Sequence, residues 1–367
     1  NVVVTSYDLM RRDIDEYVEQ DFARVVLDEA QYIKNPLTQV ARAAKRLPAG
    51  VRFALTGTPI ENRLSELWSI FDFLMPGLLG TQESFAKRFE SPVEHAEGDS
   101  AARLQALVSP FVLRRVKEDV VADLPEKIED TVMAQLTGEQ RKLYLANQDR
   151  IAQQVQHREA TEFKKDKLKV LAELTKLRQI CCDPHLHYED YKAGSAKLDT
   201  CMELVHGALD GGHRILLFSQ FTGMLDIIGK RLAKEDIAFL KLTGASSKES
   251  RAKMVAQFQA GEVPVFLISL KAGGVGLNLT AADVVIHYDP WWNVAAQDQA
   301  TDRAHRIGQQ HTVTVYKLIA KDTIEERIMQ MQESKRDLVN SVLGGDGISS
   351  ALFTREAVLA LLGGDGR

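Results

Sequence analysis

The sequence has few cysteines, no long apolar run and no excess of positive charge. Three cysteines in 367 residues are too few for a disulfide framework and fit the reducing cytoplasm. No apolar run approaches the roughly 18 residues that a membrane-spanning helix needs. A formal net charge of −5 excludes a uniformly basic coat for nucleic acid. We therefore expect a cytoplasmic protein in which any contact with nucleic acid comes from local basic stretches.

What the sequence does contain is the pattern of an α/β protein. Hydrophobic residues make up 45% and charged residues 26% of the chain, as in ordinary globular proteins, and the length allows two or three domains. Short β-branched runs recur at Val2–Thr5, Val25–Asp28, Arg52–Thr56, Ile215–Phe218, Val265–Ser269, Val284–His287 and Val313–Leu318. Because helical patterns separate these runs, we expect parallel sheets covered by helices on both faces.

A long stretch with almost no strand signal separates the two groups of strands, from about Leu78 to Lys197. Within it, Glu139–Glu159 and Lys167–Cys181 read as helices, and Thr323–Leu343 predicts a further amphipathic helix. We divide the chain into an incomplete first α/β lobe (1–77), a helical insertion and linker (78–195), a complete second α/β lobe (196–320) and a C-terminal helix and tail (321–367). Because Asn1 directly precedes a strand-like run, we expect that the chain was cut from something larger.

Two neighbouring acids follow a short apolar run. Asp28 and Glu29 come directly after Val25–Leu27, so we expect them at the end of a buried strand. At that place Asp28 could hold a magnesium ion through water, while Glu29 could orient or deprotonate an attacking water. Taken alone, such a pair is more often an ordinary acidic loop.

Two further loops have the composition of phosphate-sensing turns. Ala54–Pro59 is the end of a strand followed by a hydroxyl-rich turn, although Thr, Gly and Pro also form ordinary turns. Ser269–Asn278 joins a strand to a helix through glycines that let the backbone approach a polyanion. That loop lacks the G-x-G-x-x-G form of a dinucleotide site, so its pattern alone is weak.

A pair of arginines lies near the C-terminal end. Arg303 and Arg306 are three residues apart, a helical spacing that predicts both guanidinium groups on one face. Two such groups suit a phosphate, because each can donate two parallel hydrogen bonds to its oxygens. Acids for metal and water, with arginines for developing charge, are the parts of a nucleotide-hydrolysing site. These acids and arginines are far apart in sequence, so they can meet only across a cleft between two lobes.

Six motifs occur in one order along the chain. They are Asp28-Glu29-Ala30-Gln31, Thr56-Gly57-Thr58-Pro59-Ile60-Glu61-Asn62, Leu113-Arg114-Arg115, Phe218-Ser219-Gln220-Phe221, Gly273-Gly274-Val275-Gly276-Leu277-Asn278-Leu279 and Asp302-Arg303-Ala304-His305-Arg306-Ile307-Gly308-Gln309. Together they closely resemble the Swi/Snf-like ATPase family of helicase superfamily two, over about residues 1 to 335. The acidic motif ending in Gln and the compact linker are more similar to bacterial members than to eukaryotic remodellers.

The resemblance implies two RecA-like lobes that close on ATP and magnesium and grip double-stranded DNA. Such proteins hydrolyse ATP to ADP and phosphate and move along the duplex without separating its strands. Their target would be a DNA-bound protein complex, and a bacterial member would lie with the nucleoid.

The same resemblance assigns roles residue by residue. The implied catalytic residues are Asp28, Glu29, Arg303 and Arg306, with magnesium held by Asp28 through water. The implied nucleotide-binding residues are Gln31, Thr56, Gly57, Thr58, Gly274, Gly276 and Gln299. The implied DNA-binding residues are Asn62, Arg114, Arg115, Ser269, Lys271 and Trp292. For Trp292 core packing competes with base stacking, and for the two neighbouring arginines the alternative is a solvated helix face.

One part of the family pattern is absent from this sequence. The family's phosphate loop, a glycine-rich turn ending in Gly-Lys-Thr or similar, does not occur. Without it the β- and γ-phosphates lose a backbone cradle and a lysine, so we expect this chain alone to be inactive. Two alternatives therefore stay open, a non-catalytic DNA-binding or regulatory module and a strand-separating helicase. A zinc site at Cys181-Cys182 is rejected because the spacing fits no standard zinc pattern.

Overall fold

The computed structural model describes residues 1–57, 64–91, 99–115, 124–157, 160–273, 277–291, 294–331 and 355–363. These residues form two compact units, one made of residues up to 114 and the other of residues from 115 onward. Both units combine parallel strands with helices, as the sequence predicts. No described helix is both long enough and apolar enough to cross a membrane.

The first unit is built on a two-stranded parallel sheet. Strands β1 (Phe22–Leu27) and β2 (Ala49–Ala54) pair so that Leu27 lies opposite Ala54. The helical elements are α1 (Tyr7–Arg12), α2 (Ile14–Val18), η1 (Ala30–Ile33), α3 (Gln39–Arg46), α4 (Leu64–Leu74), α5 (Gln82–Phe85), η2 (Ala86–Glu90), α7 (Ser100–Val108) and η3 (Ser109–Phe111). Thr38 sets the start of α3, because its side-chain oxygen accepts a hydrogen bond from the amide of Ala41. Side chains of α1, α3 and α4 pack with β1 in one core.

One face of this small sheet is apolar and open to solvent. Val26 and Phe53 are paired in register, and they are 56% and 46% exposed. Val51 and Leu55 add to the same surface. Parallel sheets are usually covered on both faces, so an exposed apolar face is unusual for such a sheet.

The predicted strand at Val2–Thr5 is wrong. Residues 1–6 form neither helix nor strand, and Val2 and Val4 are almost fully exposed. A β-branched run becomes a strand only where a neighbouring strand supplies hydrogen-bond partners. Among the described residues of the first unit, β1 and β2 pair only with each other.

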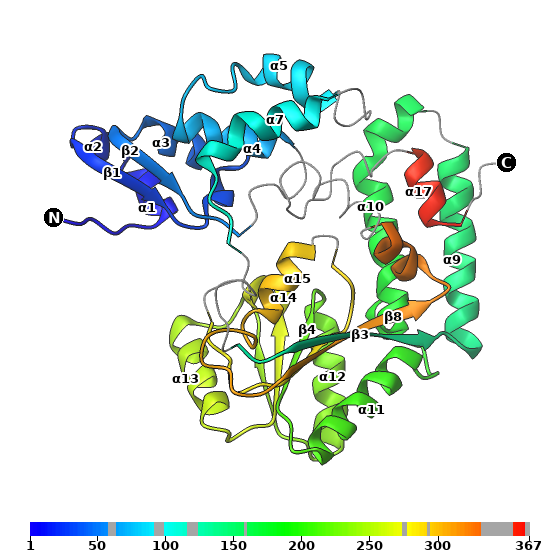
Figure 1. The fold of residues 1–367 in the computed structure, drawn as a ribbon. Helices are drawn as coiled ribbons and strands as arrows, with labels where there is room; N and C mark the ends of the chain where they lie inside the picture. The colour runs from blue at the N-terminus through cyan, green and yellow to red at the C-terminus, as the bar shows by residue number, and fades with distance from the viewer. Residues whose placement is uncertain are drawn as a thin grey trace. The chain divides into compact units, whose positions relative to one another are not determined.

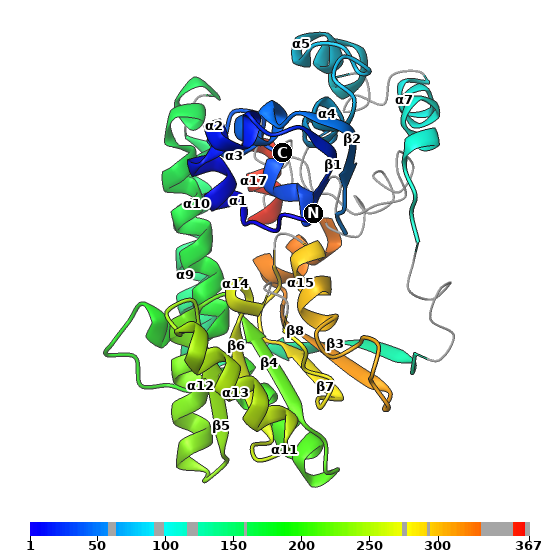
Figure 2. The same cartoon turned by 90° about the vertical axis from the view of Figure 1, so that its left-hand side faces the viewer.

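The second unit contains a six-stranded, wholly parallel sheet with the order β3-β8-β7-β4-β6-β5. The strands are β3 (Lys127–Gln135), β4 (Ile215–Ser219), β5 (Phe239–Leu242), β6 (Val265–Ser269), β7 (Val284–His287) and β8 (Val313–Lys321). Figure 2 shows β5 at one edge and β3 at the other. Every residue of β4, β6 and β7 is buried, as expected for central strands whose two faces are both covered.

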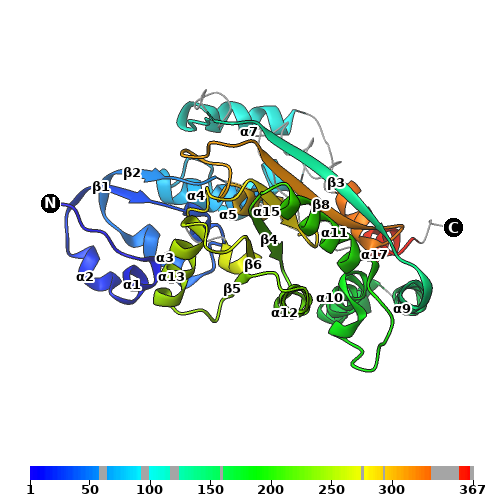
Figure 3. The same cartoon turned by 90° about the horizontal axis from the view of Figure 1, so that it is seen from below.

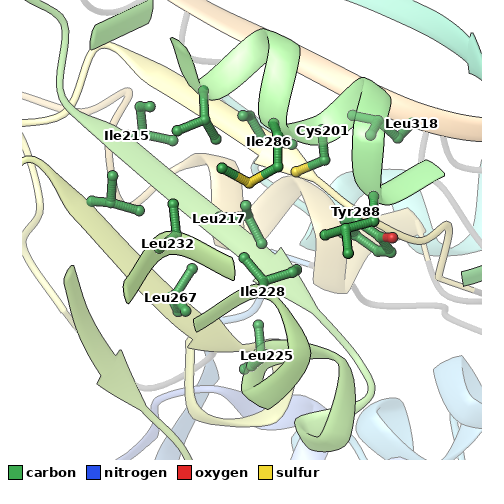
Figure 4. Close-up of a cluster of buried hydrophobic side chains, with 14 of the residues drawn as sticks. Cys201, Ile215, Leu217, Leu225, Ile228, Leu232, Leu267, Ile286, Tyr288 and Leu318 are labelled. Carbon is green, nitrogen blue, oxygen red and sulfur yellow. The ribbon is translucent and has the colours of Figure 1, made fainter. Parts of the chain in front are cut away.

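Helices cover both faces of this sheet (Figure 1). Helices α11 (Ala196–Asp210) and α12 (Thr222–Lys234) pack on one face. Figure 4 shows that core, in which Ile228 of α12 lies against Leu217 and Leu267. Helices α13 (Lys248–Gln259), α14 (Leu270–Gly273) and α15 (Val294–Thr301) contribute to the core on the opposite face. The sheet is therefore a doubly covered α/β layer.

Two long helices precede α11 and belong to the same unit. Helices α9 (Gly138–Gln156) and α10 (Ala160–Cys182) lie side by side (Figure 3), which confirms both helices predicted in this stretch. Their shared core includes Ile151 and Leu177, and α17 (Arg355–Leu361) packs against it; a short turn, η4 (Pro184–Leu186), follows α10. Residues 324–331 are helical and Thr323 forms a bend, while residues 332–343 of the predicted helix Thr323–Leu343 lie outside the described residues.

Strand β3 was not predicted from the sequence. It lies in the stretch that lacks a strand signal, and it pairs with β8 over its full length. Three of its first four residues are charged, and as an edge strand it has a single buried residue, Ala134. Two of these charges are paired, because Glu129 receives hydrogen bonds from Lys127 and Lys317, each at 2.6 Å. Because β3 lies at the sheet edge and is held partly by ion pairs, it lacks the alternation of apolar residues from which a strand is usually predicted.

Candidate functional site

The predicted acidic loop lies at the carboxyl end of β1. Asp28 and Glu29 follow Leu27, the last residue of the strand, and both are exposed. The Asp28 side chain accepts a hydrogen bond from the amide of Glu29 at 2.9 Å through Oδ1. Its other carboxylate oxygen accepts no hydrogen bond from any described residue. That oxygen is therefore available to a ligand.

A hydrogen-bond chain joins this loop to the loop after β2. Gln31 Nε2 donates to Glu29 Oε2 at 2.5 Å, and Thr56 Oγ1 donates to Gln31 Oε1 at 2.7 Å. The backbone places the loops together, because Ala30 N donates to Leu55 O and Leu55 N to Leu27 O, each at 2.8 Å. The structure thus brings together Asp28, Glu29, Gln31 and Thr56, all predicted from two separate motifs.

Glu29 has an unusual backbone conformation. Its φ is 49°, in the left-handed region that residues with a side chain rarely adopt. The neighbouring hydrogen bonds to Asp28 and Leu55 hold this conformation. Non-glycine residues held in this way concentrate at functional sites, where the surrounding fold compensates for the strain.

Tyr7 is a member of this site that the sequence did not reveal. Its hydroxyl donates to the backbone oxygen of Asp28 at 2.7 Å, and its ring stacks on Tyr32 with centroids 5.1 Å apart. Burial raises the pKa of Tyr7, and the negative charges of Asp28 and Glu29 raise it further. The phenol therefore stays a donor at neutral pH. No spacing in the sequence marks Tyr7, because only the packing of α1 brings it to this loop.

In the second unit, polar side chains gather at the carboxyl ends of β4, β6 and β7. Ser219 Oγ donates to Asp289 Oδ1 at 2.5 Å, and Gln220 N donates to Asp289 Oδ2 at 3.2 Å. Ser269 is 4% exposed, and its hydroxyl has no hydrogen-bond partner among the described residues. A direct contact of Ser269 with DNA stays a prediction.

His287 is a second residue that sequence reasoning missed. Its ring stacks on Phe218 with centroids 5.5 Å apart, and its Nε2 lies 2.8 Å from Thr301 Oγ1 at the end of α15. Burial, and then the charge of Lys317, lower the pKa of His287 to about 3. The imidazole is therefore neutral at physiological pH and serves to hold α15 on the sheet.

The helix predicted for the arginine pair is wrong. Helix α15 ends at Thr301, and residues 302–308, which include Arg303 and Arg306, form turns. Tertiary hydrogen bonds set these turns: His305 Nε2 lies 2.8 Å from Pro125 O, and Gln309 Nε2 donates to Ala282 O at 2.8 Å. Both arginines are partly exposed, and the Arg306 guanidinium donates to Leu277 O at 3.2 Å.

The other predicted site residues are placed less completely. Gly57 is exposed after β2, Gln299 is partly exposed on α15, and Lys271 belongs to α14. Arg114 and Arg115 are exposed in a segment without helix or strand, so the alternative of a helix face does not apply to them. Thr58, Asn62, Gly274, Gly276 and Trp292 lie outside the described residues.

The three cysteines are buried free thiols. Burial raises the pKa of Cys201 to about 12, so this thiol is inert at neutral pH. Within the described ranges, no group of three or more His, Cys, Asp or Glu side chains could hold a metal ion.

Two family models match the chain. The SNF2-related domain matches residues 1–186, and the helicase conserved C-terminal domain matches residues 196–308. The solved SWI2/SNF2 ATPase core of Sulfolobus solfataricus in complex with dsDNA is similar, with a TM-score of 0.52 and 38% identity, over 92% of this chain and 72% of that chain. The α/β fold with parallel sheets and RecA-like lobes is therefore shared with known ATPase cores.

Curated relatives extend far beyond the matched region. An uncharacterized ATP-dependent helicase of Mycoplasma pneumoniae is 40% identical over 98% of this chain and 34% of its own length. A putative ATP-dependent helicase/translocase of Bacillus subtilis is 41% identical over 97% of this chain and 39% of its own length. The human TATA-binding protein-associated factor 172 is 35% identical over 98% of this chain and 23% of its own length. The chain thus spans about a third of the length of the bacterial relatives.

Proposed function

Because this chain belongs to the family defined by the SNF2-related domain, we propose that it is the motor portion of an ATP-dependent double-stranded DNA translocase. In the full-length protein it hydrolyses ATP to ADP and phosphate and moves along duplex DNA. The observation that carries this proposal is the hydrogen-bond chain from Glu29 through Gln31 to Thr56. It links the residue that would handle the attacking water to the loop that would sense phosphate.

The acidic loop fits a nucleotide with magnesium. Asp28 is exposed and has one carboxylate oxygen that accepts no hydrogen bond from the described residues, which suits a hard cation held through water. When bound, the ion would neutralise charge on the phosphate oxygens. Glu29 would orient or deprotonate water, and Gln31 and Thr56 would hold its carboxylate in place.

The second unit would supply the positive charge for the same reaction. Arg303 and Arg306 are partly exposed on turns after α15, and Gln299 is partly exposed on α15 itself. Guanidinium groups stabilise the charge that develops on transferred phosphoryl oxygens. We assign the two arginines this role and Gln299 a role in binding the nucleotide.

Duplex DNA is the proposed track. The similar Sulfolobus core was solved with dsDNA, and the exposed Arg114 and Arg115 offer phosphate contacts on this chain. A DNA-bound protein is the proposed target, since one relative is named a TATA-binding protein-associated factor. Strand separation is the second candidate, because two bacterial relatives are named helicases.

The test is ATP hydrolysis by the full-length protein with and without linear duplex DNA. We expect DNA to stimulate turnover and Glu29→Gln to abolish it while ATP binding is kept, because the new amide still offers Gln31 an oxygen to bond. Equal loss of binding and turnover would make Glu29 a structural residue. A labelled forked duplex in the same reaction separates the candidates, and release of a strand would favour the helicase.

A further inference from the structure

A large buried cation in the second unit has no part in the proposed chemistry. Arg178 lies near the end of α10 and is 2% exposed, which makes it one of the largest fully buried side chains described. A buried guanidinium is costly unless charge and hydrogen bonds compensate it. Its partners therefore indicate what keeps it there.

The two terminal nitrogens of Arg178 donate hydrogen bonds to two loops at the carboxyl edge of the sheet. One terminal nitrogen donates to Gln220 Oε1 at 3.2 Å, and the other donates to the backbone oxygen of Pro290. Its guanidinium carbon lies 5.8 Å from the centre of the Phe221 ring. Gln220 and Phe221 follow β4, whereas Pro290 follows β7, so one side chain bridges both loops to α10.

Asp289, which precedes Pro290, connects the same two loops directly by hydrogen bonds. It is fully buried and accepts hydrogen bonds from Ser219 Oγ and Gln220 N of the β4 loop. Burial raises the pKa of Asp289, and the nearby charge of Arg178 opposes that rise. The two loops and the end of α10 therefore share one buried, charge-compensated cluster.

The loop after β7 leads directly into the residues proposed to meet nucleotide and DNA. Trp291 N donates to Gln297 Oε1 at 3.4 Å, which connects the loop to the first turns of α15. Gln299 lies two residues further along that helix. A shift of Pro290 relative to α10 would thus move the start of α15.

We propose that Arg178 is a positioning residue that fixes the loops after β4 and β7 relative to the α9–α10 pair. Through the position of these loops, it determines how strongly DNA stimulates ATP turnover. This inference rests on the proposed function. Helix α10 is anchored independently, since Leu174, Leu177 and Ile180 pack into the core shared with α9. The guanidinium is the polar link between that anchored helix and the two loops.

The test compares wild type with Arg178→Lys in the full-length protein. Lysine keeps the charge, but its compact ammonium cannot reproduce the planar fork that reaches both loops. We expect the ratio of DNA-stimulated to basal turnover to fall roughly tenfold to a hundredfold, as for other losses of positioning, while basal turnover stays at the wild-type level. Thermal unfolding of both proteins establishes that the variant is folded.

Arg150→Lys is the matched control. It makes the same exchange on α9, where Arg150 pairs with Glu173 of α10, and none of its described hydrogen bonds or ion pairs reaches either loop. The ratio of DNA-stimulated to basal turnover of this variant should equal that of wild type. On the loop side, Gln220→Glu keeps an acceptor for Arg178 and should keep the ratio, whereas Gln220→Leu should reproduce the loss. The double variant of Arg178→Lys and Gln220→Leu should be no worse than either single one.

The outcomes are distinguishable. An unchanged ratio in Arg178→Lys, with a DNA-stimulated wild type, overturns this inference and leaves the proposed function intact. An equal fall of basal and stimulated turnover makes Arg178 a structural residue and overturns it as well. A wild type without DNA stimulation overturns both proposals.

Discussion

At the scale of single residues, Glu29 combines the proposed chemistry with backbone strain. Its left-handed φ of 49° turns the chain sharply after β1, so that Gln31 can bond back to its carboxylate. An ordinary strand exit would carry Gln31 away from this carboxylate. The strain is thus part of how the site is assembled.

This strain predicts an order of local stability among variants. Glu29→Gly should be more stable than Glu29→Ala by about 1 kcal/mol, because glycine adopts the left-handed region without steric cost. Both variants should lose ATP turnover. Hydrogen exchange at the amides of β1 and β2 measures the local stability. Equal protection in the two variants would show that the conformation is not strained.

The arginine pair gives a second prediction at this scale. Arg303→Ala or Arg306→Ala in the full-length protein should lower ATP turnover by roughly a thousandfold or more, as expected for arginine fingers. Arg306→Lys tests the contribution of geometry, since it keeps the charge. Steady-state hydrolysis at saturating ATP and DNA provides the measurement, and a loss below tenfold would remove the proposed role.

At the scale of elements, the sequence predicted the strands and helices that have a clear local pattern of apolar residues. The central strands β4, β6 and β7 are apolar runs that end in a serine or a histidine, and α9 and α10 have a regular apolar face. Strand β3 and the turns at Arg303 and Arg306 depend instead on distant partners, Lys317 for the strand and Pro125 for the turns. Tyr7 joined the site in the same way, through tertiary packing that no spacing encodes.

The ion pairs of β3 predict a pH dependence. Burial alone would raise the pKa of Glu129, but hydrogen bonds from Lys127 and Lys317 outweigh it and lower the pKa from 4.5 to about 2. Because the folded-state pKa is below the unfolded one, this stabilisation is present above pH 4.5 and is lost as the pH falls towards 2. The difference in unfolding free energy between wild type and Glu129→Gln should shrink over that window. Denaturant titrations at several pH values measure it, and a constant difference would contradict the assignment.

At the scale of the whole molecule, the sequence motifs predicted the family and the α/β class, which the comparisons confirm. The division into residues 1–77, 78–195, 196–320 and 321–367 stays a prediction, as do the individual site roles. Global charge is the other property visible at this scale. With a formal net charge of −5, the proposed binding of DNA would have to use local patches such as Arg114 and Arg115.

Such binding should depend strongly on salt. If backbone phosphates dominate, the logarithm of the affinity should fall linearly with the logarithm of salt concentration, by about 0.9 per neutralised phosphate. Arg114→Ala and Arg115→Ala should each reduce that slope by about 1. Fluorescence anisotropy with two duplexes of unrelated sequence gives both slope and specificity. A flat salt response, or affinity for only one duplex, would contradict backbone binding.

The pairing of β3 with β8 has a consequence during synthesis on the ribosome. Lys317, which bonds to Glu129 across this pair, is made 188 residues after it. At translation rates of about 5–20 residues per second, β3 waits roughly 10 to 40 seconds before its only described neighbouring strand exists. The charged residues of β3 favour its solubility while it is unpaired. The six-stranded sheet of the second unit can be completed only after β8 has been synthesised.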